Sequence, residues 1–134
     1  MNGIIYAATS FLIRVGVLNP KVLEVGSRIS DDEQWGKYGS FKALLPRGSH
    51  LGLDMQAGRN VDQVGNVADL SLSLVKFQTV LCLEVLEHCF EYETALDRMA
   101  EATEQDGVFV LSTPYRVVLH GYPSDYWRFT PDSH

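Results

Sequence analysis

Two short apolar segments, each with an acidic residue and a nearby glycine, constrain the fold of this chain more than any other feature. Residues 22–27 read Val-Leu-Glu-Val-Gly-Ser, and residues 51–55 read Leu-Gly-Leu-Asp-Met. Such segments are typical of neighbouring parallel strands, and open α/β sheets bind ligands at the carboxyl ends of their strands. Asp54 ends the second segment, where it is well placed to accept hydrogen bonds from both hydroxyls of a ribose. The pattern therefore predicts a site for a nucleoside-containing cofactor.

Length, charge and cysteine content limit the class of protein and its partners. The 134 residues are enough for one domain with one core. The net charge is −6 and the Lys and Arg residues are scattered, whereas nucleic-acid binding needs clustered basic residues. Two cysteines, Cys82 and Cys89, are most simply those of a reduced, cytoplasmic protein. We expect no nucleic-acid partner.

The N-terminal segment 4–17 is fairly apolar, but Arg14 interrupts it. It is too short to span a bilayer, which takes about 20 residues. We expect a helix that lies against the domain, and no membrane partner. A signal peptide is the alternative, although the segment lacks a basic start and a clear cleavage site.

The rest of the chain alternates between expected strands and expected helices. Strands are predicted at 21–25, 50–55, 61–64, 77–83 and 108–111, helices at 38–45 and 92–103, a loop or weak helix at 68–75, and a turn at 105–107. This alternation predicts a doubly wound, mostly parallel α/β sheet. We expect one domain with an N-terminal helical segment (1–20), a cofactor-binding core (21–112) and a lid or substrate-side loop (113–134).

The turn after the first strand indicates which cofactor fits. Dinucleotide sites have Gly-x-Gly-x-x-Gly there, because backbone amides must approach a pyrophosphate. This chain reads Gly-Ser-Arg-Ile-Ser-Asp over 26–31, so only Gly26 is present. The carboxylate of Glu24 would repel a phosphate and attract a cation. S-Adenosylmethionine carries an ammonium and a sulfonium and no phosphate, so the charges favour it over NAD.

Several segments, taken in order, resemble a known family. They read Glu-Val-Gly-Ser (24–27), Gly-Leu-Asp-Met (52–55), Asn-Val-Ala-Asp-Leu (66–70), Cys-Leu-Glu-Val-Leu-Glu-His (82–88) and the strand that runs from Gly107 to Pro114. The series resembles the successive motifs of class I S-adenosylmethionine-dependent methyltransferases over about residues 20–131. Segment 120–131 is similar to the part after the fifth strand in some small-molecule members. The resemblance implies the Rossmann-like fold of that class, here without its C-terminal strands.

The resemblance also implies roles for particular residues. It places the cofactor on Glu24, Gly26, Ser27, Asp54, Met55, Asn66, Val67, Leu83 and Glu84. The residues at the first and fourth strands would surround its methionine part, and the others its ribose and adenine. His88 would stand near the reacting methyl, and His88 or His120 could serve as a general base. Two positions differ from the family pattern, with Arg28 where a second glycine is usual and Asn66 where Asp is common.

Each acidic residue also has a simpler interpretation. Glu24 could cap a helix or pair with a nearby Lys or Arg, and Asp54 could be an ordinary turn residue. Glu84 and Glu87 could be carboxylates at a helix N-terminus, where they are favoured. We nevertheless expect Glu24 and Asp54 to face one groove, because the cofactor hypothesis depends on it.

A zinc site is a further alternative for the residues around the fourth strand. Cys82, His88, Cys89 and His120 carry suitable ligand atoms, but their spacing fits no common zinc pattern. We therefore expect no metal. The aromatic cluster near the C-terminus is interpreted either as a packed lid or as a substrate wall: Tyr122, Tyr126, Trp127 and Phe129.

These observations together predict an S-adenosylmethionine-dependent methyltransferase acting on a small-molecule acceptor. A binding module without catalysis, or a truncated subunit that a partner completes, is the second hypothesis. An NAD-binding domain is the third, and the missing glycines disfavour it. An exposed side of the fifth strand would favour a homodimer.

Overall fold

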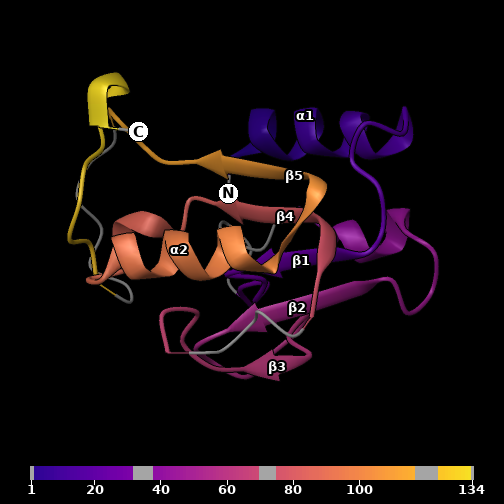
Figure 1. Ribbon diagram of the computed structural model, residues 1–134, viewed down its shortest axis with the longest axis horizontal. Coiled ribbons are helices and arrows are strands. Elements are labelled where there is room, and N and C mark those ends of the chain that lie inside the picture. The colour runs from indigo at the N-terminus through magenta and orange to yellow at the C-terminus, as the bar shows by residue number, and fades with distance from the viewer. Residues whose placement is uncertain (1, 32–37, 70–74, 117–123, 134) are drawn as a thin grey trace.

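A five-stranded parallel sheet forms the centre of the protein, with strand order β3-β2-β1-β4-β5 (Figure 1). The computed structural model describes residues 2–31, 38–69, 75–116 and 124–133. The strands are β1 Val22–Val25, β2 His50–Asp54, β3 Gln63–Val64, β4 Phe77–Leu83 and β5 Thr103–Ser112. The helices are α1 Gly3–Arg14 and α2 Tyr92–Ala102, with 3-10 turns η1 Phe41–Leu44, η2 Leu86–His88 and η3 Pro131–Ser133. The predicted parallel α/β fold is confirmed.

Side chains alternate across the sheet, so that each face has its own apolar core. On one face α2 packs against the sheet, as its position over β4 in Figure 1 shows. This core contains Leu23, Val25, Leu53, Val80, Cys82, Ala95, Met99 and Ala102. The other face is covered by α1 and η1, and its core contains Ile13, Leu18, Val22, Phe41 and Leu81. Helical segments on both faces make the sheet doubly wound.

The strand order places a switch point between β1 and β4. β1 lies in the middle of the sheet, pairs with β2 on one side and with β4 on the other, and is buried along its whole length. Crossovers therefore leave β1 and β4 toward different edges. A crevice forms at the carboxyl ends of two strands where the order reverses in this way.

The region after α2 differs from the prediction. The turn expected at 105–107 is wrong, because α2 leads directly into β5 at Thr103. The pairing of β5 with β4 shifts there: Phe77 faces Thr103, whereas Thr79 faces Val108. The extra residues of β5 are mostly exposed. Their polar composition is typical of a turn, so the sequence could not distinguish a turn from an irregular edge strand.

Two other elements are shorter than expected. The helix predicted at 38–45 is reduced to η1, which begins after Ser40, whose hydroxyl caps it by accepting from Lys42 N. The strand predicted at 61–64 begins only at Gln63. The carboxylate of Asp62 accepts the hydrogen bond of Gly52 N, at 2.8 Å. The backbone N–H of Asp62 also donates to Gly52 O at 2.8 Å, and the regular pairing of β3 with β2 begins at the next residue, Gln63.

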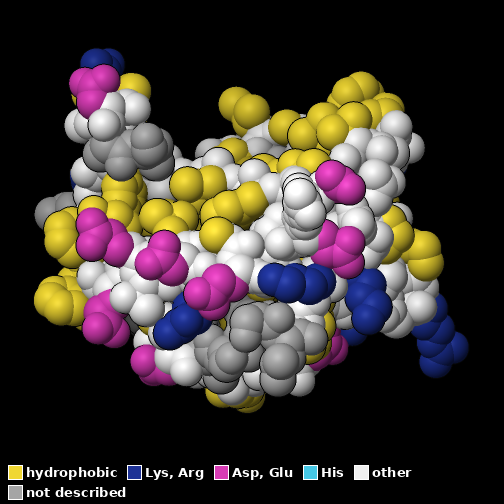
Figure 2. Space-filling model, in the orientation of Figure 1, with side chains coloured by type: hydrophobic (Ala, Val, Ile, Leu, Met, Phe, Trp, Pro, Cys, Tyr) yellow, Lys and Arg dark blue, Asp and Glu magenta, His cyan; other side chains and the backbone are white. Residues whose placement is uncertain are grey.

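Much of the surface of α1 is apolar. Ile4 and Phe11 are 82% and 62% exposed, and Figure 2 shows hydrophobic side chains gathered over α1. Within the described ranges, no helix has both the length and the apolar character needed to cross a membrane.

Candidate ligand-binding site

A cavity of about 200 Å³ lies at the switch point, between the turn after β1 and the end of β4. It is lined by Glu24, Val25, Gly26, Ser27, Arg28, Ile29, Ser30, Tyr38, Gly39, Leu83 and Glu84. Five of the residues predicted to hold a cofactor are therefore brought together: Glu24, Gly26, Ser27, Leu83 and Glu84. The lining residues include the acids Glu24 and Glu84 and the base Arg28, whose Nε donates to Ala57 O at 3.2 Å.

Gly26 makes the close approach of the two strand ends possible. Its φ of +70° is in the left-handed region, and a Cβ there would lie 2.3 Å from Cγ2 of Val85. Its backbone N–H donates to Leu53 O at 2.8 Å. A side chain at this position would therefore separate the turn after β1 from the segment after β4.

Glu24 is hydrogen-bonded by a histidine that the sequence analysis did not single out. His50 Nε2 lies 2.6 Å from Glu24 Oε2, and Asn60 Nδ2 donates to the same oxygen at 3.3 Å. The register pairs Val22 with His50 and Glu24 with Gly52, which places Glu24 and His50 on one face of the sheet. The interpretation that Glu24 pairs with Lys or Arg is thus replaced by a pairing with histidine.

Asp54 lies on the same face as Glu24 but outside the cavity. It is two residues beyond Gly52, the register partner of Glu24, so the two carboxylates do not point to opposite faces. Its oxygens accept hydrogen bonds from Arg28 N and Gln56 N, both at 3.0 Å. Asp54 therefore ties the turn after β1 to the end of β2.

The remaining predicted cofactor residues lie beyond the cavity lining. Met55 is 59% exposed, whereas Val67 is 4% exposed and packs in the core beneath α2. The side chain of Asn66 accepts a hydrogen bond from Ala68 N at 3.0 Å, which closes a local turn. Their contact with an adenine stays a prediction.

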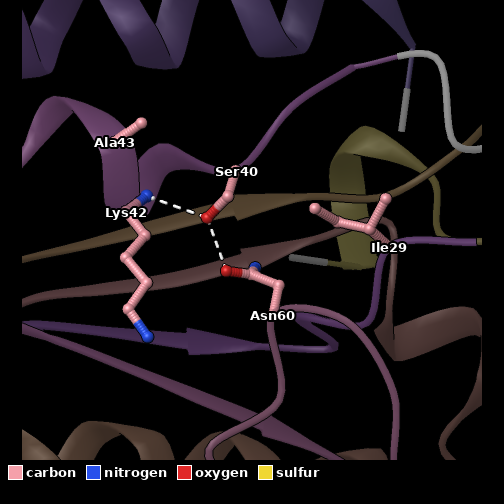
Figure 3. Close-up of a pocket in the computed structure, with 5 residues that line it drawn as sticks. All are labelled: Ile29, Ser40, Lys42, Ala43 and Asn60. Atoms are coloured by element: carbon pink, nitrogen blue, oxygen red, sulfur yellow. Dashed lines mark hydrogen bonds between the residues drawn. The ribbon is translucent and has the colours of Figure 1, made fainter.

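A second, more open hollow shares Ile29 with the cavity. Figure 3 shows its lining residues, which come from the turn after β1, from the η1 region and from the loop after β2: Ile29, Ser40, Lys42, Ala43 and Asn60. Ser40 Oγ and Asn60 Oδ1 are 2.5 Å apart. Because Asn60 also contacts Glu24, this polar chain connects the hollow to the cavity wall.

The segment after β4 places a second carboxylate in very different surroundings. Glu87, in η2, is 1% exposed, and no hydrogen-bond partner for its buried Oε2 lies among the described residues. Burial raises the pKa of Glu87 to about 7; the carboxylates of Glu84 and Asp125 act in the same direction and Arg128 acts against them. The next residue, His88, has its Nε2 3.7 Å from Glu87 Oε1. A buried acid with a raised pKa beside a histidine is a common arrangement at functional sites.

The described part of the C-terminal segment covers this acid. The backbone amides of Tyr126 and Trp127 donate to Glu87 O at 2.7 and 3.3 Å, and His88 Nδ1 contacts Ser124 O. The ring of Phe129 lies edge-on to that of Tyr92, at 5.0 Å between centroids. Residues 124–129 therefore pack against η2 and the start of α2.

The other predictions for this region are tested only in part. His120 and Tyr122 lie outside the described residues. Burial raises the pKa of the Cys82 thiol strongly, and that of Cys89 to about 11, so neither is a thiolate at neutral pH. The described ranges contain no group of three or more metal-ligating side chains.

Three site residues escaped the sequence analysis: His50 and Asn60, which hold Glu24, and Glu87, which was treated only as a possible helix cap. His50 begins an expected strand two residues before Gly52. Once a parallel register was assumed, its side chain could have been placed beside Glu24. No local signal marks Asn60, and none shows that Glu87 is buried, because the covering segment is distant in sequence.

A parallel sheet of order β3-β2-β1-β4-β5, with an acid-lined cavity at the ends of β1 and β4, defines a Rossmann-like α/β domain. Solved structures narrow the class to the class I methyltransferase-like fold. Streptomyces venezuelae DesVI is 18% identical, with a TM-score of 0.60 over 82% of this chain and 50% of DesVI. The sugar N-methyltransferase KedS8 from Streptoalloteichus sp ATCC 53650 is 14% identical, with a TM-score of 0.60 over 86% of this chain and 52% of its own.

A third structure has bound ligands. The 1,6-didemethyltoxoflavin-N1-methyltransferase of Burkholderia thailandensis, solved with 1,6-didemethyltoxoflavin and S-adenosylhomocysteine, is 18% identical, with a TM-score of 0.60 over 95% of this chain and 62% of its own. This chain spans about half the length of DesVI and KedS8. Neither a protein-family model nor a curated protein sequence matches it.

Proposed function

We propose that the chain binds S-adenosylmethionine, with the amino-acid end of the cofactor in the cavity between β1 and β4. The observation that carries the proposal is the position and charge of that cavity. It lies at the switch point of a class I methyltransferase-like sheet, and its wall contains Glu24, Glu84 and Arg28.

The charges match a zwitterion. The ammonium group of the cofactor would lie near Glu24 and Glu84, and its carboxylate near Arg28. Arg28 occupies the place of a second glycine in the family pattern, so a side-chain cation would serve where related turns offer backbone amides. The ribose would then extend toward Asp54, at the end of the adjacent strand β2.

We further propose that the chain belongs to an enzyme that methylates a small-molecule acceptor. S-Adenosylmethionine supplies a methyl group on a positively charged sulfur, which is a good electrophile. The residues of this chain would have to orient the acceptor and exclude water. His88, which is next to Glu87 and contacts Ser124 O, would accept the proton of a hydroxyl or amine acceptor. His120 stays the second candidate for this role.

A module that binds the cofactor without catalysis is the second candidate function. One observation favours it: His88 lines neither of the two cavities described above. An NAD site fits less well, since two carboxylates would face a pyrophosphate. A homodimer stays a prediction, which light scattering on the purified chain would test.

Calorimetric titrations test the proposal. The full chain should bind S-adenosylhomocysteine and not NADH, and Glu24→Gln should weaken that binding. Glu93→Gln is the matched control, because it makes the same charge change on the exposed side of α2. Release of S-adenosylhomocysteine from S-adenosylmethionine, only in the presence of an added amine or hydroxyl acceptor, would separate enzyme from module. NADH binding with no binding of S-adenosylhomocysteine would overturn the proposal.

A further inference from the structure

The two carboxylate oxygens of Glu24 have different surroundings. Oε2 accepts from both His50 Nε2 and Asn60 Nδ2. Among the described residues no donor reaches Oε1, although Glu24 lines the cavity. One oxygen is therefore anchored to the protein, and the other is left for a ligand with a hydrogen to donate.

His50 can anchor Glu24 without touching a ligand. Its side chain is 1% exposed, and it is not part of the cavity wall. It begins β2 on the same face as Glu24, so the imidazole reaches along the sheet beneath the carboxylate. At 2.6 Å the contact is short, as expected of a hydrogen bond to an ionised acceptor.

The opposite side of the imidazole faces a second carboxylate. In the part of the chain that the structure describes, the buried Nδ1 of His50 has no hydrogen-bond partner, and it lies 3.8 Å from Asp62 Oδ2. Asp62 is held by Gly52 N at 2.8 Å and by Lys42 Nζ at 3.1 Å, and the Gly52 hydrogen bond is the main cause that lowers its pKa. Because a carboxylate oxygen only accepts, the 2.6 Å contact with Glu24 Oε2 requires a hydrogen on His50 Nε2.

We propose that His50 is a positioning residue for the cavity: by donating to Oε2, it turns Oε1 of Glu24 toward the ammonium group of the bound cofactor. The inference rests on the proposed binding of S-adenosylmethionine, and it adds that affinity for the amino-acid end depends on a residue outside the cavity. It predicts that loss of His50 weakens ligands that carry the ammonium and spares those that do not.

Two probes and two variants test this inference on the full chain. S-Adenosylhomocysteine carries the amino-acid end, whereas 5′-methylthioadenosine has the same nucleoside and a thioether but no ammonium. His50→Leu should weaken S-adenosylhomocysteine by roughly tenfold to a hundredfold, as expected for a lost charge-assisted hydrogen bond. It should change 5′-methylthioadenosine by less than about twofold. His50→Gln, which can still donate to Glu24, should restore most of the affinity.

A double variant adds a control that a purely structural role would fail. In Glu24→Gln the His50→Leu change should cause no further loss, because both changes remove one interaction. Equal weakening of both probes by His50→Leu and by His50→Gln, in folded protein, would overturn the positioning role. So would undiminished binding of S-adenosylhomocysteine by His50→Leu. If the unmodified chain binds neither probe, the proposed function itself fails.

Discussion

Two acids, Glu24 in β1 and Glu87 in the segment after β4, lie in opposite surroundings. Glu24 lies beside an open cavity and accepts hydrogen bonds from His50 and Asn60. Glu87 is covered by residues 124–129. Among the described residues its Oε2 has no hydrogen-bond partner, and burial raises its pKa to about 7. Glu24 is the third residue of an apolar strand, and Glu87 comes four residues after the end of another. The two carboxylates therefore differ through the donors and the covering segment around them, rather than through their place in the motif.

The largest loss of stability is expected when the packing of residues 124–129 is disrupted. Phe129 is 5% exposed and packs against Tyr92, so Phe129→Ala should destabilise the protein by about 3 kcal/mol. Tyr126→Ala, at a ring that is 50% exposed, should cost less than about 1 kcal/mol. Urea unfolding measures both. Equal losses of stability would show that Phe129 is packed no more tightly than the half-exposed Tyr126.

The next effect is a change of stability with pH that depends on the charge of Glu87. An acid whose pKa is raised by folding destabilises the folded state as pH rises from its ordinary value of 4.5 to about 7. The stability difference between Glu87→Gln and the unmodified chain should therefore change by about 3 kcal/mol in favour of Gln over that interval, and stay level above it. Thermal unfolding at pH 4.5, 6 and 8 checks the sign.

Glu93→Gln, on the exposed surface of α2, should show no such trend with pH. If the stability difference between Glu87→Gln and the unmodified chain does not change with pH, folding does not raise the pKa of Glu87.

The smallest effect on stability is expected at the turn after β1, which lines the cavity. Gly26→Ala and Gly48→Ala both place a side chain at a φ in the left-handed region, at +70° and +81°, which costs about 1 kcal/mol. Only at Gly26 would the new methyl meet Val85, at 2.3 Å. Gly26→Ala should therefore cost about 1–2 kcal/mol more than Gly48→Ala, as measured by urea unfolding. The double change Gly26→Ala with Val85→Ala should recover part of that difference, and equal costs would place Val85 away from the turn.

The sequence predicted the parts of the fold that depend on local pattern. The apolar segment 77–83 coincides with β4, and the helical spacing after Tyr92 predicted α2 to within a residue. The turn at 105–107 was wrong because polar residues on an irregular edge strand have the composition of a turn.

The candidate site likewise has parts that the sequence predicted and parts that it did not. Glu24, Gly26 and Glu84 could be placed at one cavity, because the carboxyl ends of adjacent parallel strands meet at one edge of the sheet. The pairing of Glu24 with His50 depends on the register between strands. The burial of Glu87 depends on contacts with residues 124–129, far away in the chain, which no motif encodes.

A crystal structure of the full chain with S-adenosylhomocysteine tests the central claim most directly. We expect its amino group within about 3.2 Å of the carboxylate of Glu24 or Glu84, with its ribose toward Asp54. A ligand bound beside Glu87, or anywhere else away from the turn that contains Gly26, would contradict it.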